Sequence, residues 1–123
     1  MATATVRVGD LPPLRVEVAR TREEHTQGLS GRERLPPGTG MLFVFDEPMT
    51  SGFWMYEVNF PLSLAWVRDG HVIGTVEMVP CRSADPDDCR AYEPPAPYTR
   101  VIEAPAGTFV EVERGASVRV AGD

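Results

Sequence analysis

The sequence contains no lysine, and its twelve arginines are outnumbered by eighteen acidic residues, which gives a net charge of −6 at pH 7. The absence of lysine excludes Schiff-base chemistry on a lysine and a phosphate-binding P-loop, because both need that side chain. The acidic balance argues against binding to duplex nucleic acid or to an anionic membrane surface. We therefore expect no nucleic-acid partner.

Long hydrophobic runs are also absent. The longest, Gly40–Phe45, has about six residues, whereas a transmembrane helix needs ~20. The first residues, Met1–Arg7, lack the charged start and apolar stretch of a secretory signal. We therefore expect no membrane insertion and a cytoplasmic location for the chain as written. An exported domain is the alternative if the chain has been trimmed from a longer precursor.

Cysteine and histidine are scarce, with two residues of each type. A structural zinc site needs about four ligands, and the two histidines are far apart in sequence. We expect His25 on the polar face of a short helix and His71 beside a turn. No metal ion and no cofactor are therefore predicted. Cys81 and Cys89 lie in a proline-rich segment without periodicity. We predict a disulfide between them, worth ~2.5 kcal/mol in the chain-entropy model; two reduced thiols are the alternative in a reducing compartment.

The remaining composition fits one mostly β domain over residues 1–123. Apolar residues make up 42 %, and 12 prolines and 11 glycines divide the chain into short segments. This punctuation is typical of a β-rich domain. We predict a mostly β (α+β) fold: a small antiparallel β-barrel-like domain of about seven to nine short strands with one short helix. The candidate strands are 5–8, 14–18, 41–45, 53–56, 60–67, 72–79, 100–104, 108–113 and 117–120.

The single helix is predicted from a capping box. The Thr21 hydroxyl can accept a hydrogen bond from the Glu24 amide, and the Glu24 side chain can return to the Thr21 amide. The pattern predicts a helix over residues 22–29, with Gly28 and Gly31 as stop signals.

The clearest hairpin turns at Asp69-Gly70, a two-residue loop that favours a type I′ turn. This loop pairs Val67 with Val72 and Trp66 with Ile73. Both faces of the hairpin are apolar, so we expect it to be central and covered on both sides. The bulky face would collect Phe60, Leu62, Leu64, Trp66 and Ile73, and the other face Ala65, Val67, Val72 and Val76.

Six segments follow one another in a recognisable order: Gly28-Leu29-x-x-Arg32, Gly40–Phe45, Phe53–Met55, Phe60–Leu62, Pro80-Cys81 and Ile102–Gly107. From Val16 to Val120 the chain thereby resembles the prokaryotic family of uncharacterised conserved proteins called domain of unknown function 192. The resemblance implies a compact, mostly β, barrel-like domain with one short helix, and it implies no activity or catalytic residue. Relatives usually carry Met, Lys and Asp where this chain has Ser30, Tyr56 and Ser63.

Three glutamates are candidates for acid–base chemistry, namely Glu57, Glu77 and Glu103. The predicted register places Glu77 opposite Leu62 on the bulky face, where apolar surroundings would favour the protonated form that a general acid needs. The alternative to a catalytic role is a structural one, in which Glu77 forms an ion pair with Arg32 or Arg100. Two such carboxylates about 5–9.5 Å apart across a cleft would suit a small hydrolase acting on a carbohydrate-like substrate.

An aromatic stretch beside polar residues indicates a binding surface, because aromatic faces stack on sugars and other flat ligands. Our first hypothesis is a binding module for a small, carbohydrate-like molecule. Its predicted binding residues are Arg32, Trp54, Met55, Tyr56 and Glu57, with Arg32 as the anchor for an anion or carboxylate. The alternatives are a small carboxylate-dependent hydrolase and a protein-interaction domain without a small-molecule site. The catalytic residues, if any, are unassigned.

Overall fold

The computed structural model describes residues 1–122. Its elements are β1 (Ala2–Val8), β2 (Leu14–Ala19), α1 (Arg22–Gln27), β3 (Thr39–Met49), β4 (Leu62–Arg68), β5 (His71–Met78), the 3-10 turn η1 (Pro86–Asp88), β6 (Tyr98–Pro105) and β7 (Val118–Ala121). The predicted mostly β fold with one short helix is confirmed. Two predicted strands do not form. The segment 53–56 contributes only a bridge between Phe53 and Tyr92, and the segment 108–113 is mostly turn.

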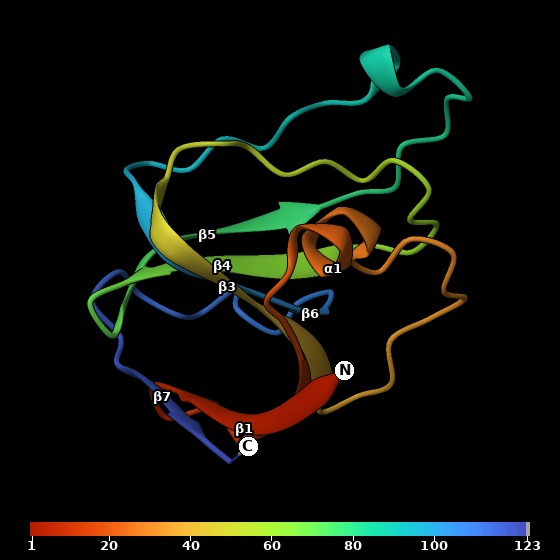
Figure 1. Cartoon of the computed structure of the whole chain (residues 1–123). Coiled ribbons are helices and arrows are strands. Elements are labelled where there is room, and N and C mark those ends of the chain that lie inside the picture. The colour runs from red at the N-terminus through yellow and green to blue at the C-terminus, as the bar shows by residue number, and fades with distance from the viewer. Residues whose placement is uncertain (123) are drawn as a thin grey trace.

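The seven strands form one sheet in the order β5-β4-β6-β3-β2-β1-β7. Neighbouring strands are antiparallel as predicted, except that β2 and β3 run parallel. The reason is that the connection through α1 returns the chain to the end where β2 began, which parallel pairing requires. The sheet curls into a half-barrel (Figure 1), and the chain before β7 reaches the start of β5. There the Val118 amide donates to the Gly70 carbonyl at 2.8 Å and the Val72 amide to the Ala116 carbonyl at 2.9 Å.

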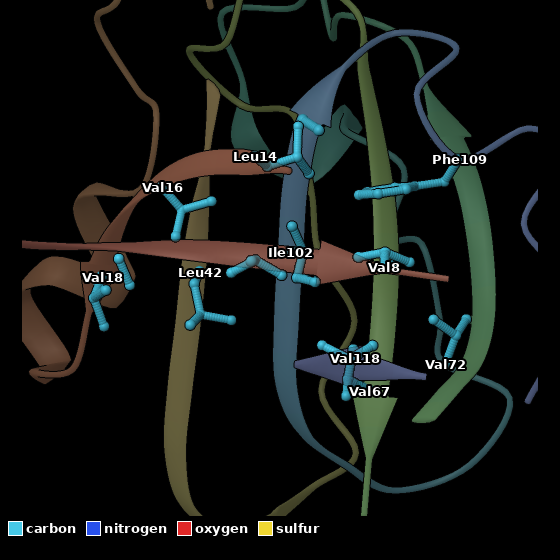
Figure 2. Close-up of a cluster of buried hydrophobic side chains, with 14 residues drawn as sticks. Val8, Leu14, Val16, Val18, Leu42, Val67, Val72, Ile102, Phe109 and Val118 are labelled. Carbon is cyan, nitrogen blue, oxygen red and sulfur yellow. The ribbon is translucent and has the colours of Figure 1, made fainter. Parts of the chain in front are cut away.

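The concave face of the curled sheet holds one of two hydrophobic cores (Figure 2). It is built from alternate residues of the strands, together with Phe109 from the connection after β6. Its labelled members are Val8, Leu14, Val16, Val18, Leu42, Val67, Val72, Ile102, Phe109 and Val118.

The second core, the outer core, lies on the face of the sheet opposite the first, or inner, core, under three segments that are mostly irregular. Leu29 follows α1, Met55 and Val58 come from the connection between β3 and β4, and Tyr92 comes from the connection between β5 and β6. The sheet supplies Met41, Phe43, Leu62, Leu64, Trp66 and Val101 to the same core. The prediction that the β4–β5 hairpin is covered on both faces is therefore confirmed. Its predicted central position is wrong, because β5 lies at one end of the sheet. The covering segments also form the candidate site.

The predicted register of the hairpin is wrong beyond its first pairs. Val67 pairs with Val72, but a β-bulge follows, so that Trp66 pairs with Gly74 instead of Ile73. Because one extra residue shifts every later side chain to the other face, Val76 packs on the outer core and not with the inner one. By the same shift Glu77 lies opposite Ser63 and not opposite Leu62 (Ser63↔Glu77, Leu62↔Met78).

The helix forms on its predicted capping box. The Glu24 amide donates to Thr21 Oγ1 and the Thr21 amide to Glu24 Oε1, both at 3.1 Å. His25 differs from expectation, because it is half-buried rather than on a polar face. Its Nε2 lies 3.0 Å from the Ala19 carbonyl and 2.9 Å from the Val44 carbonyl. Since both partners are acceptors, Nε2 carries the proton. Its contacts with the two carbonyls connect α1 to β2 and to β3.

The predicted disulfide between Cys81 and Cys89 is present. It closes the loop around η1, in the connection between β5 and β6. Among residues 1–122, none of the helices has the length and apolar character needed to cross a membrane.

Candidate functional site

A groove of about 650 Å³ opens among the segments that cover the outer core. Its walls are the turn after α1, the connection between β3 and β4, and the disulfide-closed loop. Its lining is Gln27, Ser30, Gly31, Tyr56, Glu57, Asn59, Cys81, Arg82, Ser83 and Ala84. The volume is within the range of small-molecule sites. The lining offers amide, hydroxyl, carboxylate and guanidinium groups, so the groove suits a polar ligand.

Two of the groove walls are held against each other by backbone groups. The Gly31 amide donates to the Glu57 carbonyl at 3.2 Å, and the Ser30 hydroxyl lies 3.5 Å from the Tyr56 carbonyl. Glu57 has a φ of 63°, a left-handed conformation that is unfavourable for a residue with a side chain. Buried Met55 and Val58 fix the chain on either side of it. The fold therefore holds the Glu57 side chain on the groove at an energetic cost.

The third wall, the disulfide-closed loop, is held in place by contacts within the loop itself. Besides the disulfide, the Ser83 hydroxyl donates to Asp88 Oδ2 at 2.9 Å, and the Asp85 carboxylate accepts from the Asp87 amide at 2.9 Å. These contacts hold the backbone on which Arg82 and Ser83 reach the groove.

A narrower cavity of about 60 Å³ adjoins the groove and shares Gln27, Ser30 and Tyr56 with it. The aromatic side chains of Phe43, Phe53, Trp54 and Tyr56 contribute to its wall, together with His25, Val58, Glu103 and the turn after α1. Together the two cavities form a wide polar space with a small, aromatic side pocket.

Glu103 is the one acidic residue in the lining of the side pocket. It lies on β6, paired with Met41 of β3 and Leu64 of β4, and it is only 5 % exposed. Among residues 1–122, no hydrogen bond or salt bridge to its carboxylate is found. Burial raises the pKa of Glu103 to about 8, because a low-dielectric surrounding disfavours the charged form. At neutral pH the Glu103 carboxyl is therefore mostly protonated.

The structure brings three of the five predicted binding residues to these cavities. Trp54 is half-exposed and lies beside Tyr56, with ring centroids 5.4 Å apart, and both line the side pocket. Glu57 lines the groove. Met55 lies beneath them in the outer core, with 1 % of its surface exposed. Arg32 lines neither cavity, because its guanidinium pairs with the Glu17 carboxylate through both terminal nitrogens.

Glu77 is separated from the other two candidate carboxylates, of which Glu57 lines the groove and Glu103 the side pocket. Glu77 faces the inner side of the sheet, where it accepts hydrogen bonds from the Ser63 hydroxyl and from the Gly107 amide, the latter at 2.7 Å. The Ser63 oxygen in turn accepts from the Phe109 amide at 3.0 Å. Glu77 therefore fixes the turn after β6, on the opposite face from Glu103. Within the described residues no cluster of three His, Cys, Asp or Glu side chains is arranged to hold a metal ion.

The family model of DUF192, described as "Uncharacterized ACR", matches residues 4–120. The chain belongs to the DUF192 family. The resemblance stated from the six segments is thereby confirmed. No curated protein matches the sequence.

Two solved structures share the fold of this DUF192 chain. A crystal structure from Sinorhizobium meliloti, described as a candidate transcription regulator, is 27 % identical with a TM-score of 0.84, over 97 % of this chain and 94 % of that one. A protein of unknown function from Novosphingobium aromaticivorans is 27 % identical with a TM-score of 0.79, over 95 % of this chain and 84 % of that one. Neither description names a ligand or an active site.

Several groove residues were not singled out from the DUF192 sequence. Gln27, Asn59, Arg82 and Ser83 are polar residues in turns and loops, where no periodicity marks a functional position. Ser30 drew attention only because relatives usually carry methionine there. The predicted disulfide between Cys81 and Cys89 was a signal that could have pointed to Arg82 and Ser83, since it indicates that the loop between the two cysteines is held in place.

Proposed function

We propose that the chain is a binding module for a small, polar, carbohydrate-like molecule that lies in the groove against Trp54. The observation that carries the proposal is the exposure of this indole, of which 50 % is accessible. Trp54 lines the side pocket and lies against Tyr56, which lines both the pocket and the groove. Large aromatic surfaces of this kind stack on the apolar faces of ring-shaped ligands while their neighbours bind the polar edges.

The polar lining supports a hydroxyl-rich ligand. Gln27 and Asn59 carry amide groups, Glu57 a carboxylate and Arg82 a guanidinium, so that donors and acceptors both face the groove. A hydroxyl group is itself a donor and an acceptor and can use both kinds of partner. The ion pair with Glu17 leaves Arg32 outside this set.

Tryptophan fluorescence tests the proposal, because the two tryptophans differ in environment. Trp54 is half-exposed, whereas Trp66 is buried with 3 % exposed. We expect a panel of mono- and oligosaccharides to include one that changes the Trp54 emission in a saturable way. Calorimetry, which does not depend on the indole, should then show binding at least about tenfold weaker in Trp54→Ala. The control is Val110→Ala, an exposed residue that lines neither cavity. Saturable binding that is equally tight in Trp54→Ala, or no binding across the panel, would contradict the proposal.

A carboxylate-dependent hydrolase is the second candidate, and the protonated carboxyl of Glu103 favours it because a general acid needs that form. The second carboxylate would be Glu57, since Glu77 faces the other side of the sheet. Hydrolysis of an aryl glycoside that is lost in both Glu57→Gln and Glu103→Gln, but retained in Glu111→Gln, would favour the enzyme. Absence of turnover by a chain that binds sugars would leave the binding module.

A further inference from the structure

We infer that the side pocket is a subsite for a positively charged ammonium group, held by the Glu103 carboxylate and by the aromatic rings around it. This inference rests on the proposed function and narrows its ligand to a sugar that carries a free amino group. The sugar ring would lie in the groove against Trp54, and its ammonium group would enter the side pocket.

The first support is the missing partner of Glu103. The side chain is 5 % exposed and lines the pocket. Burial alone raises its pKa, with no contribution from a hydrogen bond or a charge of another described residue. Folded proteins rarely leave a buried polar group unpaired, because such a group loses its bonds to water without replacement. Ser63, the other buried polar residue of the sheet, has partners on both sides. The buried indole nitrogen of Trp66 also lacks a partner within residues 1–122, but it carries no charge and does not line this pocket. A bound ammonium group would give the Glu103 carboxylate a hydrogen-bond donor and a positive charge, which the described residues do not provide.

The second support is the aromatic wall. Phe43 and Phe53 meet edge to face with ring centroids 5.3 Å apart. Trp54 lies against Tyr56, which lines both the pocket and the groove. Aromatic faces attract cations, most strongly where water is excluded. The chain contains no lysine, and no arginine lines the pocket. A cationic ligand therefore has no lysine or arginine side chain to displace from Glu103. The net charge of −6 favours the approach of a cationic ligand.

The third support is size. A cavity of about 60 Å³ has room for roughly four or five non-hydrogen atoms, since one water occupies about 10–15 Å³ on this measure. That volume accepts an ammonium group with its first carbons but not a sugar ring. The ring then fits the groove of about 650 Å³, which shares Gln27, Ser30 and Tyr56 with the pocket.

The other titratable groups that line the pocket are His25 of α1 and Tyr56 of the β3–β4 connection. Nε2 of His25 is committed to the Ala19 and Val44 carbonyls. From β3 and β4, the residues beside Glu103 are the apolar Met41 and Leu64. Glu103 is mostly protonated at pH 7, because burial raises its pKa to about 8. Binding of an ammonium group therefore expels a proton from this carboxyl to the solvent.

The test is calorimetric titration at pH 7 with glucosamine, glucose and N-acetylglucosamine, in buffers of different ionisation enthalpy. We expect glucosamine to bind about tenfold more tightly than glucose or N-acetylglucosamine. Only glucosamine should release close to one proton per complex. Glu103→Gln should abolish both the preference and the proton release while it still binds glucose. Trp54→Ala should weaken all three sugars, and glucosamine at least as strongly as the other two, because the indole also lines the ammonium pocket.

The outcomes separate this inference from the proposed function. Equal binding of glucosamine and glucose, or tight glucosamine binding that survives in Glu103→Gln with its proton release, overturns the ammonium subsite and leaves the groove. Failure of all three sugars, together with failure of the wider panel, overturns both. Thermal melting of each variant checks that it is folded.

Discussion

At the residue scale, two buried polar side chains of the sheet show two different uses of a polar group. Ser63 accepts from the Phe109 amide and donates to Glu77, so its cost of burial is offset within the fold. Glu103 has no such partner among residues 1–122, and its burial is compensated only by protonation. On this difference rest the predicted pH dependence of stability and our proposal that a ligand binds at Glu103.

The first prediction concerns the pH dependence of stability. The pKa of Glu103 is about 8 in the folded chain, against an ordinary value of 4.5. Between these pH values the folded state holds a proton that the unfolded state has lost. The free energy of unfolding should therefore fall as pH rises, by up to about 1.4 kcal/mol per pH unit, and level off above pH 8. Glu103→Gln should lack this contribution.

Urea denaturation of both proteins between about pH 5 and pH 8 measures the difference. The exposed Glu111→Gln variant is the matched control and should follow the parent chain. Parallel pH profiles for the parent and Glu103→Gln would show that Glu103 is ionised in the folded state.

The second prediction concerns Arg32. The bidentate pair with Arg32 lowers the pKa of Glu17, chiefly through the hydrogen bond. The Glu17 contribution to stability is therefore present above the ordinary carboxyl pKa and is lost as pH falls. Both side chains are about one-third exposed (35 % and 34 %), so solvent screens the pair. A double-mutant cycle with Arg32→Ala and Glu17→Ala should give a coupling of about 0.5–1 kcal/mol.

The affinity for sugar should be unchanged in Arg32→Ala. A large loss of affinity would restore Arg32 as the ligand anchor.

The sequence offered Glu57, Glu77 and Glu103 as candidates, because composition and spacing do not reveal which face of a strand a residue occupies. The predicted register favoured Glu77, and this register fails at one bulge after Val72. Trp54, Tyr56 and Glu57 were found because they are adjacent in the chain. The unpaired state of Glu103 depends on β3, β4 and α1 together, and only the assembled fold shows it.

At the scale of elements, the groove depends on irregular segments that are fixed by short-range devices. The turn after α1 is bound to the Glu57 carbonyl, and the wall at Arg82 is closed by the disulfide. Such devices let a loop present side chains at defined positions without belonging to the sheet.

The third prediction concerns the disulfide. The double variant Cys81→Ser, Cys89→Ser should lose ~2.5 kcal/mol in the free energy of unfolding. It should also bind the groove ligand more weakly, because Arg82 and Ser83 are no longer held. Urea denaturation and sugar titration measure the two effects. The reduced parent chain serves as the control and should behave as the double variant does. Unchanged affinity in a destabilised double variant would show that this wall does not contact the ligand.

Local signals predicted some elements well and others poorly. The capping box gave the start of α1 because its two hydrogen bonds are local in sequence. The segments 53–56 and 108–113 have strand-like composition but do not form strands, since apolar residues there serve to cover the sheet. Phe109, for example, lies in a turn, and its side chain is fully buried.

At the scale of the whole molecule, a curled sheet with a core on each face explains both the fold and the site. The apolar character of both faces of the β4–β5 hairpin predicted this two-sided burial from sequence. The groove could not be predicted in the same way, because its three walls are separated by up to about fifty residues along the chain. They meet only because the outer core draws Leu29, Met55 and Val58 onto the same face of the sheet.

Thermal denaturation with and without sugar tests the binding function most directly. A ligand at 100 times its dissociation constant adds ~2.7 kcal/mol to the free energy of unfolding, which corresponds to roughly 10 °C for a domain of this size. We predict such a rise for the parent chain with the tightest sugar of the panel, and little or none for Trp54→Ala at the same concentration. An equal rise in Trp54→Ala, or no rise with any sugar, would contradict a ligand site at Trp54.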